Sequence, residues 1–189
     1  MQEKISEWFF KMRGGLWTLI FLIILFVAKK NNFNLKQILI ALTFIIAGQI
    51  WRCWAVGFIG LYRGENVKAQ KLATTGPYAL MRNPLYFGNF LIGFGWAIIA
   101  GVYAVIIFIV SFYILYNLVI IPHEEKFLKN KFGLQYEYYC SKVKRFFPKK
   151  FNLKDLRGNF DSKILIRSEI HTIISTLIGT LIIIVVCYT

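Results

Sequence analysis

Five long apolar runs constrain the fold of this chain more than any other feature. They cover residues 14–28, 35–61, 85–99, 102–121 and 170–188. A backbone inside a bilayer must satisfy its own polar groups, so apolar runs of roughly 15–25 residues are typical of membrane helices. The sequence therefore predicts an all-α polytopic membrane protein with about five transmembrane helices, organised as a single domain over residues 1–189.

The chain carries a net charge of +14, and the distribution of its cations indicates membrane orientation. If the N-terminus is cytoplasmic, 19 Lys and Arg residues fall on the cytoplasmic side and 3 fall outside. This positive-inside bias explains the basic composition without a nucleic-acid partner. We expect an integral protein of a prokaryotic cell membrane, with its C-terminus outside. The sequence does not indicate an oligomeric state.

Residues 74–90 interrupt the helical pattern between the second and third apolar runs. Gly76-Pro77 and Asn83-Pro84 are turn formers, because proline disfavours the α conformation in the preceding residue. The aromatic and basic segment between them is too short to cross a membrane. The two dipeptides alone could simply end one helix and begin the next, but an aromatic, basic loop at a membrane surface also favours a ligand site.

A second polar stretch, residues 122–148, follows the fourth apolar run, which we expect to end at Pro122. It contains the adjacent acids Glu124 and Glu125, and Gly133 divides it into two expected short helices. Apolar residues recur there at helical spacing, so we expect a cytoplasmic amphipathic segment that does not span. This apolar stripe consists of Leu128, Phe132, Tyr136, Tyr139 and Val143. Two Pro-bounded polar stretches indicate one site assembled from both.

These two stretches resemble the paired motifs of a known enzyme family. The segment GPYALMRNPLYFGN is similar to GxYxxxRHPxYxG, and HEEKFLKNKFGLQYEYYCSKVKRFFP is similar to EExxLxxxFGxxYxxYxxxVxRxxP. Both motifs characterise the isoprenylcysteine carboxyl methyltransferases and their phospholipid-methyltransferase relatives. The resemblance covers about residues 70–148, which would form the core of the domain, with 170–188 as an extra C-terminal span.

The resemblance implies S-adenosyl-L-methionine as the cofactor and a membrane lipid-like molecule as the substrate, methylated on a carboxylate or an amine. It implies no metal. Arg82 and Glu124 are the candidate catalytic residues. The family's cofactor contacts carry over onto Gln70, Lys71, Leu72, Ala73, Tyr78, Asn83, Pro84, Leu85, Tyr86 and Glu124.

The chemistry of these residue types suits that cofactor. Methyl transfer is an in-line displacement in which positioning and desolvation do most of the work. Glu124 can accept a hydrogen bond from the cofactor's ammonium or from a ribose hydroxyl. The rings of Tyr78 and Tyr86 can pack against adenine or attract the sulfonium charge.

The sequence departs from the family pattern at three positions. Gln70 and Asn83 stand where the family has histidine, and both keep the ability to form hydrogen bonds. Ile120 stands where the eukaryotic prenylcysteine enzymes have a substrate-associated arginine. A carboxylate substrate would then need another cation, for which Arg82 and Arg63 are candidates.

Outside the motifs, the apolar runs carry few polar residues. We expect no chemistry from the first run. Arg52 lies deep in the second run, where a charge needs a partner or a wet cavity, and Glu169 is the candidate partner; snorkelling to the surface is the alternative. Glycines of the third run predict close packing against the fourth. The three cysteines have no metal or disulfide spacing.

Two other functions compete with a methyltransferase. Membrane sterol-type reductases have a similar helical layout and bind NADPH without a Gly-rich dinucleotide fingerprint, which this sequence also lacks. A non-catalytic membrane scaffold or small transporter is the other alternative, and it leaves the aromatic, polar loop unexplained. Binding of labelled cofactor distinguishes these functions.

Overall fold

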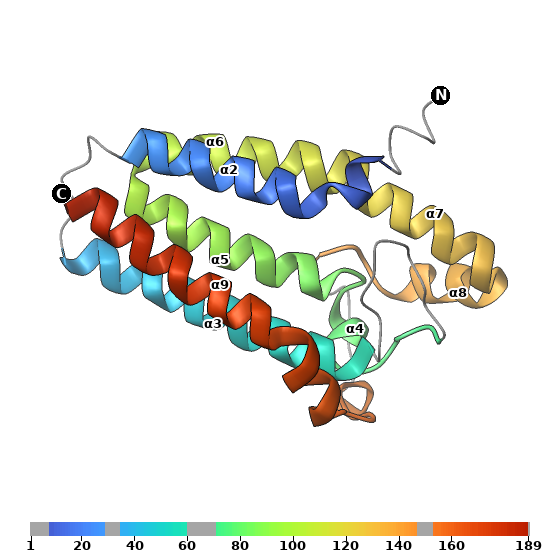
Figure 1. Ribbon diagram of the computed structural model, residues 1–189. Helices are drawn as coiled ribbons and strands as arrows, with labels where there is room; N and C mark the ends of the chain where they lie inside the picture. Colours follow the sequence, from blue (N-terminus) through green and yellow to red (C-terminus); the bar gives the residue numbers. More distant parts are fainter. Residues whose placement is uncertain (1–7, 29–34, 60–70, 147–152, 189) are drawn as a thin grey trace.

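The computed structural model describes residues 8–28, 35–59, 71–146 and 153–188, and these residues are helical with no β-strand (Figure 1). The longer apolar helices are α2 (Arg13–Ala28), α3 (Leu35–Ile59), α5 (Pro84–Ala100), α6 (Val102–Phe112) and α9 (Ser162–Tyr188). The remaining elements are the one-turn helix α4 (Pro77–Leu80), the π-helix η1 (Tyr113–Ile120), α7 (Ile121–Phe132), α8 (Leu134–Lys142) and the 3₁₀-helix η2 (Leu153–Leu156).

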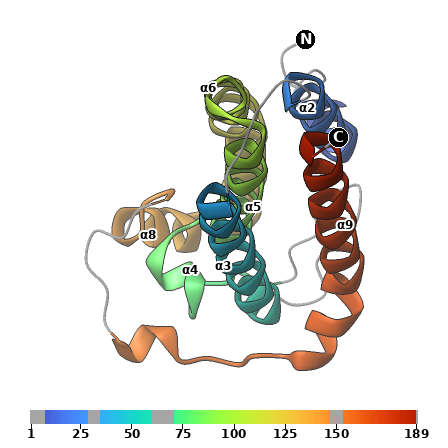
Figure 2. The same cartoon turned by 90° about the vertical axis from the view of Figure 1, so that its left-hand side faces the viewer.

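The apolar helices lie side by side as a bundle with α5 at its centre, in contact with α2, α3, α6 and α9 (Figures 1 and 2). Three helices are long and apolar enough to cross a membrane, Leu35–Ile59, Val102–Phe132 and Ser168–Cys187, and two shorter apolar helices, α2 and α5, accompany them. The all-α membrane class is therefore confirmed. The exact number of five spans remains a prediction.

Both polar stretches lie at the same end of the bundle, which we call the motif end. It contains α4, α8 and the start of α5, while the turn at Gly101 and the C-terminal end of α9 lie at the opposite end (Figure 1). Gly101 has a φ of 106°, which glycine adopts readily because it has no Cβ, and it is the single residue between α5 and α6. The expected hairpin of the third and fourth runs is confirmed.

The glycines of α5, however, mostly face a different helix from the one predicted. A Cβ added at Gly95 would lie 2.6 Å from Ile45 Cγ1 and 2.7 Å from the carbonyl oxygen of Ala41, both on α3. A Cβ added at Gly48 of α3 would likewise lie 2.8 Å from the carbonyl oxygen of Gly88. The closest backbone approach is therefore between α3 and α5. Small residues mark a contact face, but the sequence does not say which helix meets it.

We expected the chain to leave the membrane after Pro122, and the helix that contains this residue continues to Phe132. Proline removes one backbone N–H and crowds the carbonyl four residues before it. Here the eight residues before Ile121 form the wider π-helix η1, whose hydrogen bonds follow an i to i+5 pattern. This change in spacing lets the chain pass Pro122 without a break.

The amphipathic helices α7 and α8 form as predicted on either side of Gly133, whose φ is 49°. Tyr136 and Tyr139 are buried, and the rest of the predicted stripe packs around them as a small apolar cluster. Leu72, from the segment before α4, is the third buried member of that cluster. The second polar stretch is thereby packed against the lead-in to the first.

Candidate active site

Backbone hydrogen bonds hold the two motifs together at the motif end. The N–H of Arg82 donates to the carbonyl of Lys144 at 2.9 Å, and the next N–H, of Asn83, donates to Arg145 at 3.2 Å. These two residues precede α5, which begins at Pro84, where a missing N–H costs no helical bond. The segments predicted to share one site are therefore joined directly, and a shared function for them remains a prediction.

Tyr139 fixes the short helix between the two proline dipeptides. Its hydroxyl donates to the carbonyl of Tyr78 at 2.7 Å, inside the apolar cluster of α8. Burial raises the pKa of Tyr139 above its usual range, although Arg82 opposes the shift, so the phenol stays protonated and remains a donor. Gly76, with a φ of 63°, turns the chain into α4 and leaves Tyr78 buried.

Glu125 binds one arginine from each motif. Its Oε1 lies 2.9 Å from Arg82 Nη2, and its Oε2 lies 2.7 Å from Arg145 Nη2. The hydrogen bonds to Glu125 raise the pKa of Arg145. The Nε of Arg82 is buried without a hydrogen-bond partner among the described residues. Arg82, which we predicted to be catalytic, thus forms an ion pair with Glu125.

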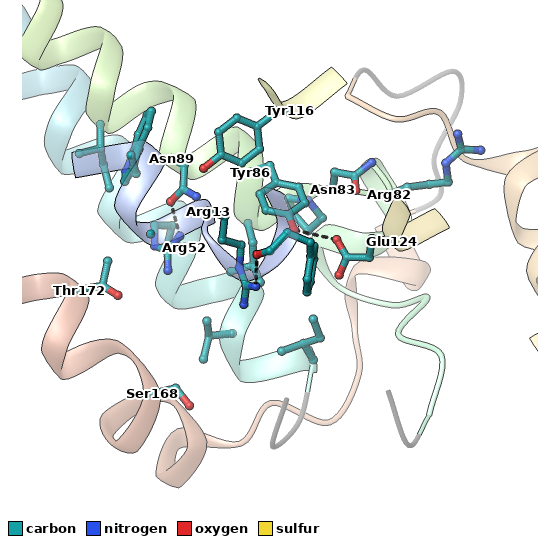
Figure 3. Close-up of a pocket in the computed structure, with 18 of the residues that line it drawn as sticks. Arg13, Arg52, Arg82, Asn83, Tyr86, Asn89, Tyr116, Glu124, Ser168 and Thr172 are labelled. Carbon is teal, nitrogen blue, oxygen red and sulfur yellow. Dashed lines mark hydrogen bonds between the residues drawn. The ribbon is translucent and has the colours of Figure 1, made fainter. Parts of the chain in front are cut away.

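Glu124 links the second motif to the first. The hydroxyl of Tyr86, in the first turn of α5, donates to Glu124 Oε2 at 2.8 Å (Figure 3). Because Glu124 lies on α7 and Tyr86 on α5, this bond fixes the carboxylate relative to the Asn83-Pro84 turn. The Glu124 carboxylate and the Tyr86 hydroxyl therefore meet beside the interrupted backbone at Asn83-Pro84.

A cavity of about 950 Å³ opens at this place and extends into the helical bundle (Figure 3). Every candidate site residue within the described part of the chain lines it; Gln70 and Arg63 lie outside the described residues. The predicted residues on the cavity wall are Lys71, Leu72, Ala73, Tyr78, Arg82, Asn83, Pro84, Leu85, Tyr86 and Glu124. Their individual roles remain predictions. Ile120 is fully buried and does not contribute to the lining.

The structure also places residues on this wall that sequence reasoning missed. Arg13 of α2, Asn89 of α5 and Tyr116 of η1 line the cavity (Figure 3). Arg13 directly precedes the first apolar run, and its position on the cavity wall was not predicted. The expectation of no chemistry from the run itself remains a prediction. The only signal in the sequence is a cation at the start of an apolar helix, which membrane orientation also explains.

Arg52 is buried and pairs with Glu169 as predicted. Its Nε and Nη2 donate to the two carboxylate oxygens at 3.1 and 2.9 Å, and its Nη1 bonds Asn89. Gln49 extends this network, donating to Glu169 at 3.4 Å and accepting from Thr176. Both charges are more than nine-tenths buried, so snorkelling to the surface is excluded. The network fastens α9 to α3 beside the cavity.

The inner part of the cavity runs between α2 and α9, over α5. Its apolar lining comes from Trp17 and Phe21 on α2 and from Ile92 and Trp96 on α5. Gly179 of α9 faces Trp96, and a Cβ added there would lie 2.9 Å from the indole. The opposite wall carries small hydroxyl side chains, Thr172, Ser175 and Thr176. The cavity is therefore charged at the motif end and largely apolar deeper in the bundle.

Comparison with known proteins agrees with the motifs. A family model described as phospholipid methyltransferase matches residues 35–135, more than half of the chain. Over 156 residues the chain is 24% identical to the nickel-cobalt-cadmium resistance protein NccN of Alcaligenes xylosoxydans xylosoxydans, covering 78% of this chain and 70% of that protein. No solved structure matches. The chain thus belongs to the phospholipid methyltransferase family and is an integral membrane protein.

Proposed function

We propose that the protein transfers a methyl group from S-adenosyl-L-methionine to a lipid-like acceptor within the membrane. The observation that carries this proposal is the Tyr86–Glu124 hydrogen bond of 2.8 Å, which joins the two motifs on the wall of one large cavity. Membership of a methyltransferase family supports the reaction class. The cofactor and the acceptor class are our proposals.

The residues at the motif end fit this cofactor. S-adenosyl-L-methionine supplies its own electrophilic methyl group, so the protein has to bind and orient it. Glu124 would accept a hydrogen bond from the cofactor's ammonium or from a ribose hydroxyl. The aromatic face of Tyr86 would lie near the positive charge of the cofactor's sulfonium. The segment 71–73 and the Asn83-Pro84 turn offer backbone groups on the cavity wall.

The inner part of the cavity fits an acceptor with a hydrocarbon chain. Trp17, Phe21 and Trp96 provide a wall that an acyl or prenyl chain would contact without exposing polar backbone. The acceptor's nucleophilic head group would then lie at the motif end, beside the cofactor. Burial there would exclude water and align the two reactants, which is how such a site accelerates transfer.

Cofactor binding tests the proposal. Purified protein in nonionic detergent should bind labelled S-adenosyl-L-methionine at micromolar concentration, about −8 kcal/mol at 1 μM. NADPH should not compete. Tight NADPH binding without S-adenosyl-L-methionine binding would indicate a reductase instead, and binding of neither cofactor would contradict an enzymatic role for this cavity.

A further inference from the structure

We propose that the cavity admits a hydrocarbon chain of limited length, and that Phe21, Trp96 and Gly179 form the end wall that sets this limit. The inference rests on the proposed methyltransferase function and specifies which acceptors the cavity takes. Phe21 lies on α2 and Gly179 on α9, and both helices flank the segment 35–135 that matches the family model. Selection by chain length would therefore depend on parts of the chain outside the family match.

The three wall residues are the deepest cavity-lining residues on their helices. The helices α2, α5 and α9 all run away from the motif end (Figure 1). Among the residues that the structure describes, none further along these three helices lines the cavity. The side chains three or four residues further on belong to the hydrophobic core and are at most 1% exposed: Ile24, Ile99 and Ile183. The cavity therefore ends at this level against packed side chains.

The wall residues contact one another across the bundle. The ring centres of Phe21 and Trp96 lie 4.8 Å apart. Gly179 presents bare backbone to the same indole, so a Cβ added there would lie 2.9 Å from Trp96 Cζ2 and 3.6 Å from Phe21 Cζ. Three helices therefore close the end of the cavity together, and a side chain at position 179 would shorten it.

A hydrogen bond holds the indole of the end wall in place. Trp96 Nε1 donates to Thr180 Oγ1 at 3.0 Å, and that hydroxyl donates in turn to the carbonyl of Thr176 at 2.7 Å. Both Trp96 and Thr180 are buried. Moving the ring aside would leave a buried donor unsatisfied, which is costly. The indole therefore acts as a fixed stop for a chain that enters from the motif end.

The end wall lies at a defined distance from the proposed cofactor site. Tyr86 and Trp96 are both on α5, ten residues apart, which is about 15 Å along the helix axis. An extended hydrocarbon chain of about twelve carbons has about that length, given tetrahedral carbons joined by bonds of about 1.5 Å. A longer chain would press against packed side chains, and overpacking of that kind is unfavourable.

Retention of a mixture of saturated monoacylglycerols tests the limit. The probes have chains of about eight to eighteen carbons, which bracket the cavity length estimated above. Purified protein is equilibrated with the mixture in nonionic detergent and recovered on affinity resin, and the bound chains are quantified by mass spectrometry. Retention by each variant is divided by wild-type retention for each chain length. Partition of the probes into detergent then cancels, because every protein meets the same mixture.

Variants that open or fill the end wall should change retention in opposite directions. Phe21→Ala and Trp96→Ala lengthen the cavity, so each should raise retention of the longest chains relative to the shortest by about fivefold or more. Gly179→Leu occupies the end of the cavity and should lower retention of the longer chains. Leu181→Ala is the control, since Leu181 is an exposed residue of α9 that does not line the cavity, and its ratios should be independent of chain length.

The outcomes separate this inference from the methyltransferase proposal. Phe21→Ala and Trp96→Ala open the same wall independently, so either one that elutes from size exclusion as the wild type does suffices. Ratios independent of chain length in the opening variants would overturn the inference. So would a length-dependent effect of Leu181→Ala, or a wild type that retains no probe above bare resin. If the wild type binds no S-adenosyl-L-methionine, the proposed function fails, and the ratios still decide whether this wall limits chain length.

Discussion

Single residues decide whether the cavity can hold the cofactor, and Glu124 is the most informative of them. It accepts a hydrogen bond from the hydroxyl of Tyr86 at 2.8 Å and lines the cavity. A carboxylate in that position offers a charge-assisted acceptor to an ammonium or ribose hydroxyl. This makes one isosteric substitution a direct test of the proposed cofactor site.

We expect Glu124→Gln to weaken binding of S-adenosyl-L-methionine about tenfold or more, because a hydrogen bond to a charged group contributes about 1.5–3 kcal/mol. Titration calorimetry on the purified protein measures the effect. Glu137→Gln is the control, since Glu137 is an exposed carboxylate paired with Lys129 and does not line the cavity. Unchanged affinity in a folded Glu124→Gln protein would remove Glu124 from the site.

Sequence reasoning was effective for residues whose partners lie in short motifs. Tyr86 and Glu124 were both named from the resemblance to the family's motifs, and the structure brings them into contact. Arg52 and Glu169 were paired because a buried charge requires an opposite one. The position of Arg13 on the cavity wall was not predicted, because membrane orientation alone explains a cation at the start of an apolar helix.

At the level of helices, the buried ion pair between α3 and α9 positions the C-terminal wall of the cavity. Glu169 is fully buried and accepts two hydrogen bonds from Arg52. Removing one member leaves the other charge buried and uncompensated, which is far costlier than removing both.

Arg52→Leu and Glu169→Leu should therefore each destabilise the protein by about 3–5 kcal/mol, and the double variant should lose less than the sum. Chemical unfolding in detergent, read as a double-mutant cycle, gives the coupling energy. Strictly additive losses would mean that the two side chains do not interact in the folded protein.

The close contact between α3 and α5 depends on glycines, which have no side chain to keep the two helices apart. Gly95→Ala would bring a Cβ to 2.6 Å from Ile45 and 2.7 Å from the Ala41 carbonyl, so the two helices must separate. Overpacking of this kind costs about 1–3 kcal/mol, and a thermal unfolding scan should show a lower midpoint. Gly15→Ala is the matched control, because its Cβ would meet only the flexible end of Met12 at 3.6 Å. Equal midpoints for Gly95→Ala and wild type would refute the close approach.

Turns between neighbouring helices were predictable from the sequence, whereas contacts between helices far apart in the chain were not. The hairpin at Gly101 and the two short helices around Gly133 follow from local turn chemistry, and both were predicted. The glycines of α5 were assigned to α6, which Gly93 does meet, but Gly88 and Gly95 meet α3, because contact between distant helices has no local signature. The passage of the helix through Pro122 was also missed, since it depends on the π-helical turns that precede it.

For the whole molecule, the charge distribution predicts which way the bundle faces. Both polar stretches gather at one end of the bundle, and the C-terminal end of α9 lies at the other (Figure 1). The positive-inside bias predicts that the motif end faces the cytoplasm. An alkaline phosphatase reporter, active only outside, should be active when fused after Thr189 and inactive when inserted at Asn152. Activity in both fusions, or in neither, would contradict the five-span topology.

The overall architecture was largely predictable, because apolar runs and two ordered motifs determine the class and the core of the site. The extent of the cavity could not be predicted from the sequence. Its inner walls come from α2 and α9, which flank the segment 35–135 and approach each other only in the folded bundle. The proposed acceptor class depends on those walls, so it required the structure.

We propose that the protein methylates a membrane lipid in this cavity, and formation of the methylated lipid tests that proposal. The most direct measurement incubates purified protein, reconstituted in vesicles of host lipid extract, with S-adenosyl-L-methionine labelled on the methyl group. We predict that label appears in the chloroform-soluble fraction with wild-type protein and falls by about tenfold or more with Glu124→Gln at subsaturating cofactor. If the protein binds the cofactor and the extract contains the acceptor, label no higher than in the protein-free control would mean that the protein does not methylate a membrane lipid.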